Sequence, residues 1–210
     1  LGDVYKRQRM RRSSTLRMKR IFLMNFNRHF NLEGKHAFLS PSTYHWINYS
    51  EDKLDDRYLT AMAAQRGSEL HEFAEHAIRL GVKVLEDGST LSLFVNDAID
   101  MGMTPEQVLF YSDNCFGTAD AIAFSNNHLQ IHDLKTGITK TSEHQLEVYA
   151  ALFCLEYGHS PFDISMELRI YQSDEVRVYD KVNPGDIAHI IDTIIQFDKR
   201  IEMLKGRLEP

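Results

Sequence analysis

The segment from Cys115 to Ala150 constrains the fold and chemistry of this chain more than any other. Two extended stretches carry Asp120 and then Asp133 and Lys135 at their ends, and an amphipathic helix follows at once. Carboxylates that converge beside an ammonium group can bind a divalent cation next to an anion. Among reactions that need both, hydrolysis of a phosphodiester is the leading candidate.

The tripeptide Asp133-Leu134-Lys135 predicts how these groups are presented. Residues two apart in a strand point to the same side, so Asp133 and Lys135 project together while Leu134 points into the core. The Leu134 carbonyl then lies near the Asp133 carboxylate. If the strand with Asp120 pairs alongside, both carboxylates can share one Mg²⁺, and Lys135 can hold or activate the attacking water.

An Asp-x-Lys tripeptide alone is more typical of solvated charges at a strand end, which form a surface ion pair. Here it is combined with Gly117-Thr-Ala-Asp120 on the preceding predicted strand and with a helix directly after it. The combination favours a site over a surface ion pair.

A second group of candidates lies on a predicted helix over residues 55–80. His71 can ligate a metal through a neutral imidazole, and Glu69 can bind a second ion or orient a ligand. Gly67 suits a close approach that a side chain would block. The alternatives are a partly buried or surface histidine and a solvated glutamate.

Gln145 and Tyr149 stand four residues apart and so share one face of the helix that follows Lys135. There they can hydrogen-bond the lysine or a substrate phosphate. The alternative is a core-facing tyrosine with a polar tip beside an exposed glutamine.

Hydrophobic periodicity and turn residues predict an α/β fold with a central mixed sheet flanked by helices. Helices are expected over 55–80, 90–103, 141–157 and from 183 onward, and strands over 108–111, 115–124, 129–135, 166–171 and 176–179. Thr141-Ser142 with Gln145 resembles a capping box, and Ser125–His128 a four-residue hairpin link. Phe73, Phe153 and the isoleucines of the last helix, among them Ile201, are assigned to the core.

The composition excludes several classes of protein. A chain of 210 residues with 43% apolar residues is enough for one domain with a single core. Two cysteines predict neither a disulfide framework nor an iron–sulfur cluster, and no apolar run approaches the roughly 20 residues of a membrane span. We therefore expect a cytoplasmic protein without a membrane partner.

The basic N-terminal segment is treated separately. Residues 3–8 look like the translation of an adapter sequence, so residues 1–23 are expected to be non-native or untranslated, and 24–210 to form a single domain. Residues 1–23 hold eight Lys/Arg and one acidic residue, a net charge of +7. Since the whole chain carries −6, residues 24–210 carry −13. That acidity opposes bulk attraction to nucleic acid, although bound cations reverse the field locally.

Taken in order, these motifs resemble the PD-(D/E)XK nuclease superfamily, and within it the RecB-like branch of CRISPR-associated and phage exonucleases. The resemblance covers roughly residues 60–180 and rests on Gly67-x-x-x-His71, Gly117-x-x-Asp120, Asp133-x-Lys135 and Gln145-x-x-x-Tyr149.

The resemblance implies a restriction-endonuclease-like core and a Mg²⁺ or Mn²⁺ site at His71, Asp120, Asp133 and the Leu134 carbonyl. It also implies Lys135 as the catalytic lysine, with Gln145 and Tyr149 supporting the site or the DNA. The chain departs from CRISPR-associated members, which carry four cysteines, and it has no ATP-binding loop. We therefore expect a stand-alone nuclease or a subunit whose motor is another chain.

The leading hypothesis is a metal-dependent DNA nuclease, most simply an exonuclease in phage or mobile-element recombination or end processing. It would act in a bacterial host cell, with a protein partner such as a recombinase or helicase. Two alternatives stay open. One is a catalytically silent nuclease-fold protein that binds nucleic acid or a protein; the other is an unrelated acidic α/β interaction protein with coincidental motifs.

Overall fold

The computed structural model describes residues 27–208, and the chain divides between Asn48 and Tyr49 into two units. In the first unit, the short 3-10 helices η1 (Phe30–Leu32) and η2 (Pro41–Asn48) have mostly exposed side chains. The segment expected to be non-native, residues 1–23, lies outside the described residues. The single domain expected for residues 24–210 stays a prediction.

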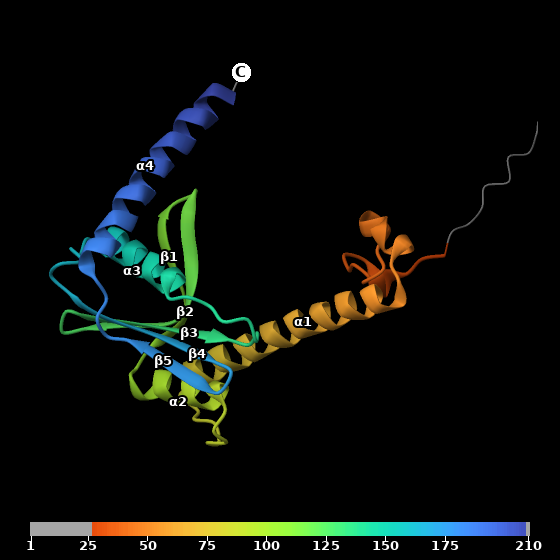
Figure 1. Ribbon diagram of the computed structural model, residues 1–210, viewed down its shortest axis with the longest axis horizontal. Coiled ribbons are helices and arrows are strands. Elements are labelled where there is room, and N and C mark those ends of the chain that lie inside the picture. Colours follow the sequence, from red (N-terminus) through yellow and green to blue (C-terminus); the bar gives the residue numbers. More distant parts are fainter. Residues whose placement is uncertain (1–26, 209–210) are drawn as a thin grey trace, which may run out of the picture. The chain divides into compact units, whose positions relative to one another are not determined.

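The second unit contains the sheet and its helices (Figure 1). Its elements are α1 (Glu51–Leu80), α2 (Thr90–Asp100), β1 (Thr104–Ser112), β2 (Cys115–Ser125), β3 (His128–Lys135), α3 (His144–Tyr157), β4 (Ser165–Gln172), β5 (Glu175–Tyr179) and α4 (Pro184–Leu208). Across the described part of the chain, no helix is long and apolar enough to cross a membrane.

The five strands form one mixed sheet in the order β1-β2-β3-β4-β5. The pairs β1–β2, β2–β3 and β4–β5 are antiparallel, whereas β3 and β4 are parallel. A parallel pair needs a long crossover connection, and α3 provides it. The expected α/β class, a central mixed sheet flanked by helices, is confirmed.

Helices cover both faces of the sheet (Figure 1), which gives two buried clusters. On one face, Leu146 of α3 and Ile187 of α4 pack with Ile131 of β3. On the other face, Ala74 of α1 and Phe94 of α2 pack with residues of the sheet. The strands β2 to β5 therefore divide their side chains between two separate cores.

Two hairpin turns explain why adjacent strands pair where they do. Asn126 and Asn127 have φ values of 51° and 58°, and Ser173 and Asp174 have 50° and 63°. Positive φ at both central residues is the geometry of two-residue turns that match the twist of a hairpin. The expected four-residue link from Ser125 to His128 is therefore wrong. Ser125 and His128 pair with each other as the last residues of β2 and β3, so the turn contains only Asn126 and Asn127.

The expected capping box at the start of α3 is also wrong. The residue that precedes α3 is Glu143, and it makes no side-chain capping hydrogen bond. The Thr141 carbonyl accepts a hydrogen bond from Arg177 Nη1 at 2.7 Å, and Gln172 Oε1 accepts from the Thr141 N–H at 3.4 Å. Contacts with the distant strands β4 and β5 thus replace the local cap.

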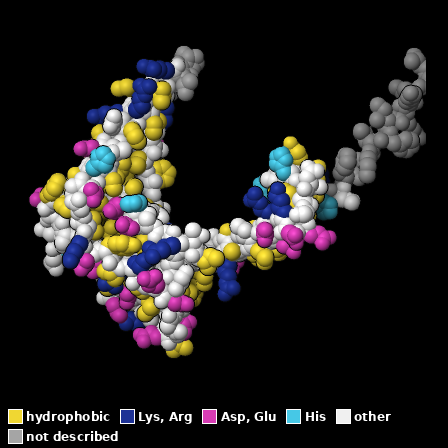
Figure 2. Space-filling model, viewed as in Figure 1, with side chains coloured by type: hydrophobic (Ala, Val, Ile, Leu, Met, Phe, Trp, Pro, Cys, Tyr) yellow, Lys and Arg dark blue, Asp and Glu magenta, His cyan; other side chains and the backbone are white. Residues whose placement is uncertain are grey.

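Two side chains assigned to the core are exposed. The exposed fractions are 48% for Phe73 and 38% for Ile201, whereas Phe153 is buried as expected. Apolar side chains are visible along α4 in Figure 2. Helical periodicity identifies an apolar face, but only the tertiary fold decides how much of that face is covered.

Candidate metal centre

Asp120 lies where strand β2 separates from β3. The β2–β3 ladder ends with the pair Ala121 and His132, and Asp120 has no partner in it. Instead, Asp120 Oδ2 accepts a hydrogen bond from the backbone N–H of Leu134 at 2.8 Å. The carboxylate is thereby fixed at the junction between the sheet and the two strands that leave it.

Glu106 is held opposite Asp120 by an unusual backbone conformation. It lies on β1 in a gap of the β1–β2 ladder, and its φ is 47°. The left-handed region costs a non-glycine residue on the order of 1–3 kcal/mol, and such strain persists where the surrounding structure imposes it, often at functional sites.

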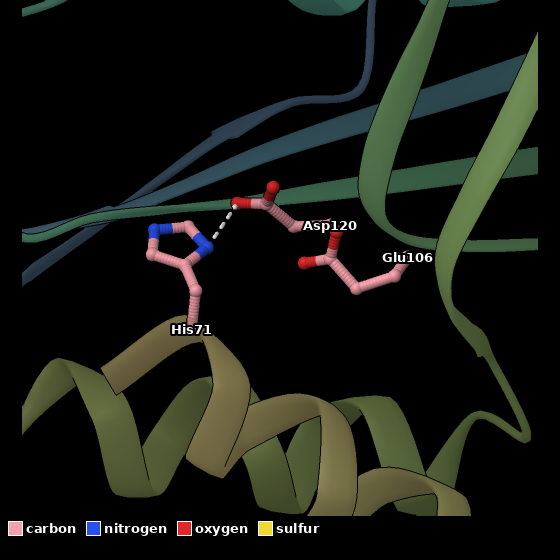
Figure 3. A group of neighbouring side chains, drawn as sticks. All are labelled: His71, Glu106 and Asp120. Atoms are coloured by element: carbon pink, nitrogen blue, oxygen red, sulfur yellow. Dashed lines mark ion pairs between the residues drawn. The ribbon is translucent and has the colours of Figure 1, made fainter. Parts of the chain in front are cut away.

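One ligand atom from each of His71, Glu106 and Asp120 lies within 4.8 Å of the other two (Figure 3). We call this group the carboxylate–histidine cluster. His71 extends from α1 toward the strands, and its Nδ1 is 3.6 Å from Asp120 Oδ2. The cluster therefore joins a helix to two neighbouring strands through groups that can all bind a cation.

The cluster borders an open cavity of about 510 Å³. The residues that line this cavity are Ala64, Gly67, Ser68, His71, Glu72, Glu75, Glu106, Asp120 and Thr136. Four of them are acidic and none is lysine or arginine. The potential in the cavity therefore favours a cation.

The carboxyl groups of the cluster are held at raised pKa values. Burial, together with the charges of Asp133 and Glu106, raises the pKa of Asp120 to about 6 against the opposing effects of His71 and the Leu134 N–H. Burial also raises the pKa of Glu106. A bound cation would remove this mutual repulsion and favour the ionised carboxylates.

Asp133 is almost fully buried, with 2% of its surface exposed. Its Oδ1 lies 2.9 Å from Lys135 Nζ, but its buried Oδ2 has no hydrogen-bond partner among the described residues. Burial raises the pKa of Asp133 although Lys135 acts against this. An unpaired buried carboxylate oxygen is costly, so the site is suited to a group that would bind it.

Lys135 is oriented by two residues of α3. Its Nζ donates a hydrogen bond to Gln145 Oε1 at 2.8 Å, and Gln145 Nε2 donates to the Tyr149 hydroxyl at 3.0 Å. Tyr149 in turn packs on Gly117, where an added Cβ would lie 2.9 Å from Tyr149 Cε1. The glycine of the Gly-x-x-Asp motif thus lets β2 approach the residues that position the lysine.

The structure brings most of the predicted residues to this region. Asp133 and Lys135 project together, Gln145 and Tyr149 form the hydrogen-bonded chain to the lysine, and His71 meets Asp120. Their roles in binding or catalysis stay predictions.

Among the remaining predicted residues, Gly67 lies as expected, whereas Leu134 and Glu69 differ in detail from the expectation. Gly67 provides a close approach, because an added Cβ would lie 2.7 Å from Thr136 Oγ1. Leu134 contacts Asp120 through its N–H, whereas its carbonyl was the expected ligand. Glu69 does not line the cavity; it accepts a hydrogen bond from Gln65 at 3.0 Å. Two residues along a helix correspond to a rotation of about 200°, which turns Glu69 away from His71.

Glu106 is the member of the cluster that the sequence did not reveal. The predicted strand began at Val108, so Glu106 was assigned to the loop after Pro105. Its place depends on the β1–β2 register and on a left-handed φ that is rare for glutamate. The only local signal was an acidic residue next to a proline, which is too common to identify a ligand.

The residues present fit a hard divalent cation. Carboxylate oxygens and one imidazole are suitable ligands for Mg²⁺ or Mn²⁺, and the unpaired oxygen of Asp133 lies on the strand next to the cluster. His71, Glu106 and Asp120 would hold the ion. Lys135, which is paired with Asp133, would then lie near the carboxylates that hold the ion.

Comparison with known proteins adds one family match. A family model described as "Protein of unknown function (DUF2800)" matches residues 106–179. The matched segment runs from β1 through β5, so it includes Glu106, Asp120, Asp133 and Lys135 but not His71. No curated protein and no solved structure shows significant similarity to the chain.

Proposed function

We propose that this protein is a metal-dependent nuclease that hydrolyses DNA phosphodiester bonds with Mg²⁺ or Mn²⁺. The observation that carries the proposal is the carboxylate–histidine cluster beside the Asp133–Lys135 pair. The resemblance of the surrounding motifs to the RecB-like branch of the PD-(D/E)XK superfamily, with its restriction-endonuclease-like core, supports the same reaction.

The residues of the site have distinct tasks in this proposal. His71, Glu106 and Asp120 hold the cation, and the free oxygen of Asp133 is available to it. When bound, the ion acts as a Lewis acid on phosphate oxygens and lowers the pKa of coordinated water.

Lys135 supplies a positive charge beside the carboxylates of the site. Its ammonium group, held by Asp133 and Gln145, stabilises negative charge that develops on the phosphate. Gln145 and Tyr149 limit the positions that the flexible lysine side chain can take, which lowers the entropic cost of orienting it.

Binding of DNA by an acidic protein is consistent with this chemistry. The cavity lining contains no lysine or arginine, so phosphate binding there depends on the cation. Within the proposal the protein acts as an exonuclease in phage or mobile-element recombination or end processing, in the cytoplasm of a bacterial host. A recombinase or helicase would supply any motor activity.

The test is cleavage of end-labelled single- and double-stranded DNA by the full chain with Mg²⁺, Mn²⁺ or EDTA. We expect cleavage only with a divalent cation. Lys135→Ala should reduce it at least about 1,000-fold while the Mn²⁺-induced rise in melting temperature persists, because the lysine acts on charge in the transition state. Lys140→Ala removes a nearby exposed lysine and should cleave like the wild type.

A second variant tests the cation ligands. Glu106→Gln should raise the Mn²⁺ concentration needed for half-maximal cleavage at least about tenfold. If the wild type binds DNA without cleaving it under all these conditions, the catalytically silent nuclease fold is the correct interpretation. If Lys135→Ala cleaves normally, the site assignment is wrong.

A further inference from the structure

The strands β1 and β2 continue past the cluster as a two-stranded ribbon. Residues 115–119 of β2 pair with β1 and not with β3, whose ladder with β2 ends at Ala121. The ribbon therefore has two faces of its own, which strand alternation assigns.

One face of the ribbon packs against the rest of the protein. Leu109 and Ala119 are fully buried in the cluster that includes α3, and Gly117 touches Tyr149. We call the opposite side the open face. Its side chains are Glu106, Val108 and Phe110 on β1, and Phe116, Thr118 and Asp120 on β2.

The open face carries a pair of exposed aromatic rings. Phe110 and Phe116 are cross-strand neighbours, and their ring centroids lie 6.4 Å apart with 29° between the planes. Phe116 is 62% exposed and Phe110 45%, and Val108 beside them is 48% exposed. The rings form a broad apolar surface, larger than a single exposed side chain provides.

The register connects this surface to the cluster. Phe110 lies four residues after Glu106 on β1, and Phe116 four residues before Asp120 on β2. At roughly 3.3 Å per residue, the rings lie about 13 Å from the candidate metal centre along the same face. A nucleic-acid strand with its phosphate at the cluster would reach the rings after about four stacked nucleotides at about 3.4 Å each, and after about two where the strand is fully extended.

The charge of the ribbon selects the form of nucleic acid. Residues 104–125 contain three acidic residues and no lysine or arginine, so the ribbon offers no positive charge to phosphates. A duplex would present its phosphates to this surface. An unpaired strand can turn its bases to it, and aromatic side chains stack on bases regardless of sequence.

We propose that Phe110 and Phe116 form a stacking platform for unpaired bases of a single-stranded DNA end whose phosphate lies at the carboxylate–histidine cluster. The identity of this ligand rests on the proposed function. The platform directs the DNA strand across the open face, while the contact of Gly117 with Tyr149 holds the opposite face of the ribbon against α3.

The experiment uses a short single-stranded oligodeoxynucleotide with 2-aminopurine at successive positions from one end. Binding to the full chain is measured with Mn²⁺ in a Lys135→Ala background, so that the strand stays intact. We expect 2-aminopurine fluorescence to be quenched most at one position, about two to four nucleotides from the end bound at the metal.

Three variants separate stacking from general apolarity. Phe116→Leu, which keeps an apolar side chain, should weaken binding about 5- to 150-fold and remove the position-specific quenching, since base stacking contributes about 1–3 kcal/mol. Phe116→Trp should retain both. Phe197→Leu changes an equally exposed phenylalanine on α4 and should bind like the parent.

The outcomes distinguish this inference from the proposed function. Position-specific quenching without cleavage by the wild-type chain would reject the nuclease and retain the platform. Normal cleavage and normal affinity in Phe116→Leu would reject the platform alone. A change in sedimentation of Phe116→Leu with unchanged DNA affinity would assign the rings to contact between copies of the chain and also overturn the platform.

Discussion

Two polar networks meet strand β3, one on the side of its neighbour β2 and the other on the side of its neighbour β4. They differ in the balance of their charges. In the first, the carboxylate–histidine cluster and Asp133 place three carboxyl groups near one ammonium group, that of Lys135. In the second, which we call the core network, Arg169 Nη1 lies 3.2 Å from Asp97 Oδ2 and Arg169 Nε 2.9 Å from Glu167 Oε1.

Histidine shows the difference most clearly. In the core network the Tyr171 hydroxyl donates to Asp97 Oδ2 at 2.7 Å and lies 3.3 Å from His132 Nδ1. Burial, with a smaller effect of Arg169, lowers the pKa of His132 to about 3, so this ring stays neutral. His71 instead faces carboxylates across an open cavity.

Buried polar groups alone therefore do not identify a ligand-binding site. In the core network Arg169 pairs with two carboxylates, and the one buried atom without a hydrogen-bond partner among the described residues is a neutral imidazole nitrogen, His132 Nε2. The cluster leaves negative charge in excess and one buried oxygen unpaired, which a cation can correct. Three predictions test whether the two networks are as separate as this contrast requires.

The largest expected effect is on cleavage. Asp120→Asn removes the negative charge at the centre of the cluster, so the rate of Mn²⁺-dependent cleavage should fall at least about 1,000-fold. Asp97→Asn alters the core network, so the cleavage rate of its folded fraction should stay within about threefold of the wild type. Similar losses in both variants, measured on end-labelled DNA, would remove the distinction between the networks.

An intermediate effect concerns acid stability. The folded pKa of His132, about 3, lies below the roughly 6.5 of an unfolded histidine. The unfolded chain therefore takes up a proton between these values, and stability present above pH 6.5 is lost as the pH falls toward 3. At pH 4 the loss amounts to about 3 kcal/mol, from about 1.36 kcal/mol per pKa unit.

Urea unfolding of the wild type and His132→Gln from pH 4 to pH 8 measures this loss. As the pH falls, the free energy of unfolding of the wild type should decrease relative to that of His132→Gln. His76→Gln changes an exposed histidine on α1 and serves as the control. If the difference in free energy of unfolding between the wild type and His132→Gln did not depend on pH, burial would not be keeping His132 neutral.

The smallest expected effect concerns the contact that positions the lysine. Gly117→Ala places a Cβ 2.9 Å from Tyr149 and should lower the free energy of unfolding by about 1–3 kcal/mol through overpacking. Gly137→Ala meets no atom within 4 Å and should change it by less than about 0.5 kcal/mol. Thermal unfolding checks both, and equal stabilities would contradict the close packing of β2 on α3.

The parts of the fold that depend on local patterns could be predicted from the sequence. Alternation in β3 indicated that Asp133 and Lys135 project together, and helical spacing placed Gln145 and Tyr149 on one face of α3. Gly81 and Gly158 end their helices in the left-handed conformation typical of such positions. These features involve residues within a few positions of one another.

The parts that failed depend on contacts between distant segments. Glu106 joins the cluster through strand register and a left-handed φ, neither of which its neighbours in sequence determine. Thr141 bonds to Arg177 on β5 and so leaves its helix uncapped. Phe73 lies on the helix α1, yet 48% of its surface is exposed, since helical spacing does not determine which part of a long helix another element covers.

The junction at Asp120 has a consequence for observing this protein in solution. The backbone amide of Leu134 is bonded to a carboxylate that also belongs to the cluster. Any ion that draws electron density from that carboxylate changes the amide's environment. Its nuclear magnetic resonance signal can therefore report occupancy directly, before any substrate is added.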